Sequence, residues 1–203
     1  HSVRQLTSYK REICGAHYDG TIRCLGMPGD HFGRQWDPQT DRNSFEAIPN
    51  TLDFRHVAIA DIHGCGVKED GRVWCWGNNA TRQLGRGPAV DQVLDLEPVH
   101  FPGLDNPQAY QDNPFVSVHT AGDGPTGHSC ARQEQGQVWC WGSDGTIGVL
   151  GLGRAINNEP FSPQPIRRSD DQSILITDGF WTGLAFSCAS VDGRYYCWGQ
   201  MDM

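Results

Sequence analysis

One pattern of paired cysteines occurs four times along this chain and uses all eight of its cysteines. A glycine stands four positions before each second cysteine, and the second cysteines are 51, 65 and 57 residues apart. Self-similarity at this scale indicates a repeat architecture, in which each repeat is one supersecondary unit. The pairs are Cys14 and Cys24, Cys65 and Cys75, Cys130 and Cys140, and Cys188 and Cys197.

Each pair predicts a β-hairpin. Within residues 65–75 the chain runs up to Asp70-Gly71 and then away from it through Val73 and Trp74. A polar residue followed by glycine is a hairpin turn signal, because glycine tolerates positive φ. Folding at this point makes the two cysteines cross-strand neighbours, close enough for a disulfide.

Two other interpretations of the cysteines are free thiols in a core and structural zinc sites. Zinc prefers cysteines separated by two to four residues, which does not fit these spacings. We therefore predict four intra-hairpin disulfides, each contributing about 2–3 kcal/mol by chain-entropy reasoning. Disulfides at this density are typical of secreted, periplasmic or cell-surface proteins.

Composition narrows the class of protein. A chain of 203 residues with 25 glycines and 7 tryptophans suits short strands and many turns in one domain or repeat array. No stretch is apolar enough for a transmembrane helix. A net charge of −8, without a basic stripe, argues against binding nucleic acid or anionic membranes. The chain starts at His1 with no visible signal peptide, as expected for a mature secreted protein.

Two stretches carry a resemblance to a known family. Residues 70–87 read DGRVWCWGNNATRQLGRG, and residues 128–142 read HSCARQEQGQVWCWG. Both resemble the repeat of the RCC1 (regulator of chromosome condensation) family, whose signature joins His-x-Cys-Ala to Trp-Gly and Gln-Leu-Gly. The fourth pattern matches at residues 186–199, and the first is degenerate. The resemblance implies an all-β fold, either an RCC1-like β-propeller or a shortened propeller relative, with four repeats that each hold an intra-hairpin disulfide.

The repeats run roughly over residues 1–50, 51–114, 115–172 and 173–203 of a single domain. Family propellers usually have more than four repeats, so we expect residues 1–13 to supply the strands that complete the fourth. Paired cysteines are typical of exported bacterial members of the family, which places the protein at the outer surface or in the periplasm.

The linkers at 88–114 and 154–172 are rich in proline and polar residues, and inserts of this kind often form a binding face.

The chain has no nucleophile elbow, metalloprotease motif or phosphate-binding loop. We therefore predict a binding protein rather than an enzyme. A carbohydrate binder or hydrolase that uses Trp36 and Trp181 is an alternative.

Histidines are the better candidates for chemistry. His63 and His128 each lie two residues before the first cysteine of a pair, so they occupy the same slot in consecutive repeats. His119 ends the apolar run that leads into the third pair, and Trp181 lies in the corresponding stretch of the fourth repeat. Imidazoles that converge near a propeller axis suit copper or zinc. A structural role for each histidine inside its repeat is the alternative.

A second, weaker resemblance favours copper. Size, acidity and compartment are similar to those of the secreted methanotroph copper proteins of the MopE and CorA type. Those proteins bind copper through two histidines and an oxidised tryptophan, which implies His63 with His119 or His128, and Trp181, as ligands here. The residue two before His63 is Asp61 rather than tryptophan. An N-terminal copper chelate at His1 is a further option.

We therefore expect a secreted or cell-surface protein that binds copper, or zinc as second choice, for metal acquisition. The alternative is an extracellular protein-interaction module without metal, whose partner is another surface protein.

Overall fold

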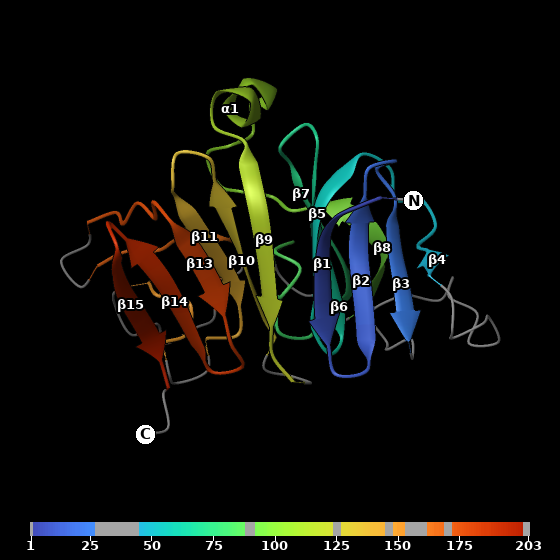
Figure 1. Ribbon diagram of the computed structural model, residues 1–203. Helices are drawn as coiled ribbons and strands as arrows, with labels where there is room; N and C mark the ends of the chain where they lie inside the picture. Colours follow the sequence, from blue (N-terminus) through green and yellow to red (C-terminus); the bar gives the residue numbers. More distant parts are fainter. Residues whose placement is uncertain are drawn as a thin grey trace.

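The computed structural model describes residues 2–26, 45–87, 92–123, 127–144, 148–152, 162–168 and 172–200. These residues form four antiparallel sheets and one short helix (Figure 1). In chain order the elements are β1 (Val3–Tyr9), β2 (Glu12–His17), β3 (Ile22–Gly26), β4 (Glu46–Ala47), β5 (Phe54–Ile59), β6 (His63–Lys68), β7 (Val73–Asn78), β8 (Gln92–Pro98), α1 (Pro107–Asp112), β9 (Phe115–Ala121), β10 (His128–Gln133), β11 (Val138–Gly142), β12 (Gln164–Pro165), β13 (Gly179–Thr182), β14 (Phe186–Val191) and β15 (Arg194–Gly199).

Each sheet is an up-and-down meander of consecutive strands drawn from one predicted repeat. The first sheet contains β1 to β4, the second β5 to β8, the third β9 to β12 and the fourth β13 to β15. The sheets follow one another side by side, with the first and the last at opposite sides of the molecule (Figure 1). This arrangement confirms the predicted all-β fold of four repeats. No helix in the described part of the chain is long and apolar enough to cross a membrane.

The expectation that residues 1–13 complete the fourth sheet is wrong. Strand β1 pairs with β2 in the first sheet, from Val3 opposite His17 to Tyr9 opposite Glu12. A tight turn at Lys10, with φ of +50°, joins the two strands. The local turn decides the outcome, since pairing with the adjacent strand closes a far shorter loop than pairing with the fourth repeat.

The hairpins and disulfides are as predicted. All four cysteine pairs are opposite one another on neighbouring strands and are disulfide-bonded. The turn glycines all have positive φ. Gly71 also needs its lack of a side chain, because a Cβ there would lie 2.6 Å from the Cβ of Pro114.

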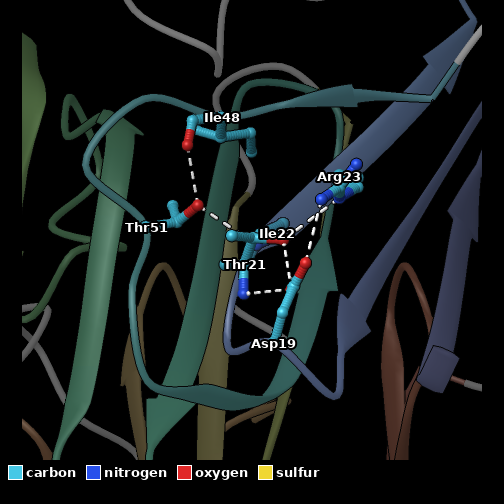
Figure 2. Close-up of polar contacts among 6 residues, drawn as sticks. All are labelled: Asp19, Thr21, Ile22, Arg23, Ile48 and Thr51. Carbon is cyan, nitrogen blue, oxygen red and sulfur yellow. Dashed lines mark hydrogen bonds and ion pairs between the residues drawn. The ribbon is translucent and has the colours of Figure 1, made fainter. Parts of the chain in front are cut away.

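Polar contacts fix the first hairpin and its connection to the second sheet (Figure 2). The carboxylate of Asp19 accepts hydrogen bonds from the backbone and hydroxyl of Thr21 at 3.0 and 2.6 Å, and pairs with Arg23 at 2.9 Å. The hydrogen bonds from Thr21 lower the pKa of Asp19 to about 2. The hydroxyl of Thr51 donates to the carbonyl of Ile48 and accepts from the backbone of Ile22, which anchors the linker to β3.

The core is divided into layers between neighbouring sheets, and a buried disulfide lies in each layer. Apolar side chains of each sheet pack on the disulfide of the sheet before it. The layers contain Cys14 and Cys24 with Phe54, Val57 and Trp76; Cys65 and Cys75 with Phe115, Val118, Ala131 and Trp141; and Cys130 and Cys140 with Phe180 and Ala189.

A pair of hydrogen bonds joins the second sheet to the third. The hydroxyl of Ser129 and the indole nitrogen of Trp141 both donate to the carbonyl oxygen of Gln83, at 2.9 and 2.8 Å. Leu84 follows and is fully buried, and Gly85 follows with φ of +65°. A Cβ on Gly85 would lie 3.1 Å from the ring of Trp141. We call this arrangement the latch.

The latch recurs one sheet later. Ser187 and Trp198 donate to the carbonyl of Val149 at 3.1 and 2.9 Å. In the first sheet the two donor positions hold Ile13 and Leu25, which cannot donate from their side chains. The Ser-Cys, Trp-Gly and Leu-Gly motifs of the sequence are thus the parts of an intersheet latch.

Replacing Trp141 with phenylalanine should destabilise the chain by about 0.5–1.5 kcal/mol more than the control variant, because the buried carbonyl of Gln83 loses one of its two donors. Urea unfolding measures the change. Trp74→Phe is the matched control, since the indole nitrogen of Trp74 forms no hydrogen bond within the described residues. Equal losses in the two variants would contradict the latch.

Candidate functional site

His63 supports the latch between the second and third sheets. It lies on β6, is fully buried, and has its Nε2 2.9 Å from the hydroxyl of Ser129. Because that hydroxyl gives its hydrogen to Gln83, Nε2 of His63 is the donor in this contact. The predicted metal ligand is therefore engaged in holding two sheets together.

His128 lies in a different layer. It is fully buried on β10, next to Ser129. Successive side chains of a strand point to opposite faces, so His128 points toward the fourth sheet while Ser129 points toward the second. The structure does not bring His63 and His128 to a common point, although they occupy the same slot in consecutive repeats.

His119 pairs instead with a histidine that the sequence analysis missed. Its ring centroid lies 5.9 Å from that of His56 on β5 and 5.4 Å from that of Phe180 on β13. The backbone N–H of Val118 donates to Nδ1 of His56 at 3.4 Å. The sequence analysis found its candidate histidines by their spacing from the cysteine pairs, and His56 lacks that spacing. Its neighbour His119 is 63 residues away in the sequence, on the innermost strand of the next sheet.

Burial keeps both rings neutral. It lowers the pKa of His56 to about 4, with a smaller contribution from the charge of Arg55. It lowers the pKa of His119 to about 3, with smaller contributions from His56 and Arg132. Neutral imidazoles at physiological pH can donate, accept or bind a metal.

The innermost strands of the four sheets line an open cavity of about 330 Å³. Two of the four predicted ligands, His119 and Trp181, are among the residues that line it. They occupy the same register position, since His119 is opposite Cys130 and Trp181 is opposite Cys188. Hydroxyl groups and apolar side chains make up the rest of the wall, which comprises Thr7, Ser8, Tyr9, Ala58, Ile59, Thr120, Ala121, Thr182, Gly183 and Leu184.

A lysine ties three sheets together beside this cavity. The ammonium group of Lys10 lies 2.6 Å from the carboxylate of Asp61 and 2.9 Å from that of Asp123, and these contacts raise its pKa. The hydroxyl of Tyr9 donates to the carbonyl of Gly122 at 3.1 Å. These contacts fix the cavity-lining ends of β1 and β9, as expected for a preformed binding site.

Among the described residues, no group of three or more His, Cys, Asp or Glu side chains is placed to hold a metal ion. The alternative candidates His1 and Trp36 lie outside the described residues, as do parts of both predicted binding linkers, 88–91, 154–161 and 169–171.

Sequence comparison finds RCC1 repeats in the middle of the chain. The two family models, both described as regulator of chromosome condensation (RCC1) repeat, match residues 70–124 and 56–83. The chain is 28% identical over 149 residues to the mouse E3 ubiquitin-protein ligase HERC2, covering 72% of this chain and 3% of that protein. It is 26% identical over 160 residues to the mitochondrial RCC1 domain-containing protein RUG3 of Arabidopsis thaliana, covering 76% of this chain and 32% of that protein.

Solved structures show the same fold. Prp20p from Saccharomyces cerevisiae superposes with a TM-score of 0.70 at 21% identity, covering 99% of this chain and 44% of that one. Human WBSCR16 superposes with a TM-score of 0.68 at 18% identity, covering 90% of this chain and 42% of that one. The chain thus spans less than half the length of these propellers.

The two neutral histidines predict that stability falls with acidity. In the unfolded chain they take up protons near pH 6.5, but in the folded chain only near pH 4 and 3. Between these values the unfolded state binds more protons, so the free energy of unfolding drops as pH falls, by about 1.4 kcal/mol per pH unit for each proton. Urea midpoints at pH 7.0, 5.5 and 4.5 measure the drop.

His119→Gln should make this pH dependence shallower, whereas His100→Gln, at an exposed histidine, should leave it unchanged. An identical pH dependence in wild type and His119→Gln would rule out burial of the neutral ring as its source.

Proposed function

We propose that this chain, which has RCC1-type repeats and an RCC1-like β-propeller fold, acts as an extracellular protein-interaction module. The observation that carries the proposal is the cavity shared by the four inner strands, with exposed apolar side chains in its wall. Trp181 is 49% exposed and Leu184 is 55% exposed, and both line the cavity.

The composition of the cavity favours a peptide segment as ligand. Aromatic side chains in partly desolvated pockets dominate the energetics of protein interfaces. Thr7, Ser8 and Thr120 line the same cavity as Trp181, and hydroxyl groups offer donors and acceptors to a peptide backbone. A cavity of about 330 Å³ suits one or two anchoring side chains of a partner.

The disulfides support an extracellular setting. All eight cysteines are paired, and disulfides persist in oxidising compartments rather than in the cytosol. Three of the four pairs also lie in the layers between sheets, where they take part in the packing that positions the inner strands.

The relatives' names suggest binding but no shared activity. The solved structure of Prp20p was described together with its binding to Gsp1p and histones. HERC2 is named a ubiquitin ligase, but this chain matches only 3% of its length. We carry over the binding role of the fold and neither the partners nor the ligase activity.

A photo-crosslinking amino acid at Leu184 should join the chain to one specific protein from the extracellular fraction of its source. The same residue at Leu52 is the matched control, since Leu52 is 60% exposed but lies outside the cavity. Excess wild-type chain should suppress the product, and excess Leu184→Glu should not. Products of equal yield from both positions would refute the cavity as the interface.

A copper site at the same cavity is the second candidate. It is favoured by the close pair of neutral imidazoles, His56 and His119, and by the presence of Trp181 in the cavity wall. Two imidazoles fit copper better than structural zinc, which takes four protein ligands.

If copper binds there, His119→Gln should lower uptake of Cu(I) at least tenfold in competition with a chromogenic chelator. His100→Gln, on the surface, should bind as wild type. Uptake by His119→Gln equal to that of wild type would remove the cavity as the copper site.

A further inference from the structure

The sequence contains one acceptor motif for N-linked glycans. Residues 79–81 read Asn-Ala-Thr, and no other asparagine of the chain is followed two positions later by serine or threonine. Asn-x-Ser/Thr motifs accept glycans in secretory compartments and usually mark a surface loop. In this structure, however, Asn79 is only 2% exposed. A motif that normally marks the surface thus lies in the interior.

The asparagine of the motif is part of the latch. Its Oδ1 accepts a hydrogen bond from the backbone N–H of Leu84 at 3.0 Å. Leu84 is fully buried in the layer that also contains Trp141. It directly follows Gln83, whose carbonyl receives the two hydrogen bonds of the latch. The side chain of Asn79 therefore holds the turn that presents the acceptor of the latch to the third sheet.

The threonine of the motif is engaged in the same place. The hydroxyl of Thr81 donates to Oε1 of Gln83 at 2.8 Å and lies 3.3 Å from the carbonyl oxygen of Gly127, which directly precedes β10. The backbone N–H of Thr81 donates to the same Oε1 at 2.9 Å. Both defining side chains of the motif thus take part in the junction between the second and third sheets.

The next repeat shows what the fold requires at the asparagine position. The equivalent residue is Asp144, which is 5% exposed and whose Oδ1 accepts from the backbone N–H of Leu150 at 2.8 Å. Leu150 directly follows Val149, the acceptor of the second latch. The fold thus requires a side-chain oxygen at this position, and an aspartate supplies it as well as an asparagine. The acceptor nitrogen of Asn79 is an addition that the latch does not require.

A glycan on Asn79 and a closed latch exclude each other. Protein interiors are close-packed, and even one added methylene group disturbs them. A sugar ring on Nδ2 of Asn79 therefore cannot be accommodated beside Leu84 in the closed junction. Because Oδ1 of the same amide holds the N–H of Leu84, turning the side chain outward to make room would also break that hydrogen bond.

The order of synthesis leaves the motif uncovered for a time. The latch donors Ser129 and Trp141 follow Asn79 by 50 and 62 residues. Chains grow at about 5–20 residues per second, so the second sheet waits about 3–12 s for both donors of its latch. During this interval the segment that contains Asn79 lacks its contacts with the third sheet.

We propose that Asn79 is an N-glycan acceptor only while the latch between the second and third sheets is open, so that glycosylation and closure exclude each other. The donor is an oligosaccharide linked to a lipid through a diphosphate. A bond forms between Nδ2 and the anomeric carbon, the bond from that carbon to the lipid diphosphate breaks, and Nδ2 releases a proton. This inference goes beyond the proposed function and does not depend on the cavity.

Glycosylation in vitro tests the proposal, with a purified oligosaccharyltransferase, its lipid-linked donor and intact mass as the readout. The reduced and alkylated chain should be modified at Asn79, and the folded chain at least about fiftyfold more slowly, because its rate follows the population of the open state. Folded Trp141→Phe, which lacks one latch donor, should react about two- to tenfold faster than folded wild type. Trp74→Phe should react as wild type.

Asn79→Asp separates the motif from the fold. It keeps the oxygen that holds Leu84, as Asp144 does in the next repeat, and removes the acceptor nitrogen. This variant should unfold in urea with a midpoint close to that of wild type. Its reduced and alkylated form should remain unmodified under the conditions that modify wild type.

Refolding tests the exclusion directly. A reduced chain that is glycosylated first and then oxidised should have a lower urea midpoint than the unmodified chain. Enzymatic removal of the glycan by an amidase converts the asparagine to aspartate, so the released chain should recover the midpoint of Asn79→Asp.

Three results would overturn the proposal. The first is a folded wild type that is modified as fast as the reduced and alkylated chain. The second is a glycosylated chain with the urea midpoint of the unmodified one. The third is a reduced and alkylated chain that the enzyme never modifies, because Asn79 would then not be an acceptor in any state.

Discussion

The latch is the interaction on which the rest of the architecture depends. The carbonyl of Gln83 receives two hydrogen bonds from the following sheet, in a layer that excludes water. Leaving that oxygen without any hydrogen-bond donor would cost about 1–3 kcal/mol, which is a substantial part of the free energy of unfolding of a small domain. The latch therefore sets how the third sheet sits on the second and how the fourth sits on the third. Because the inner strands follow from that placement, the cavity they line is a product of the intersheet geometry.

Local signals in the sequence predicted the hairpins, the disulfides and the fold family. The cysteine spacing and the Asp-Gly turns act within about ten residues, and such short-range constraints leave few alternatives. The partner of the N-terminal strand was predicted wrongly, because ring closure was assumed and the turn at Lys10 was not weighed. The sequence shows the Ser-Cys, Trp-Gly and Leu-Gly motifs of the latch but does not predict the hydrogen bonds between them. The two donors lie in one repeat and their acceptor lies in the repeat before it.

The candidate site was only partly predictable for a related reason. Equivalent residues of a repeat lie at equivalent interfaces, so His63 and His128 are one sheet apart instead of together. His119 and Trp181 share a register position opposite the first cysteine of their hairpins, which strand pairing reveals and sequence spacing does not. The match of His56 to His119 depends on two adjacent inner strands, and no motif encodes it.

Every disulfide joins the two strands of a single hairpin, and the four bonds account for all the cysteines. Covalent bonds thus hold the two strands of each hairpin together, whereas neighbouring sheets are held together only by non-covalent contacts. Under mechanical tension the residues between the two cysteines of each hairpin stay looped and contribute no extension. A fully unfolded but oxidised repeat would therefore be shorter than its full contour length, by the length of chain that its disulfide closes.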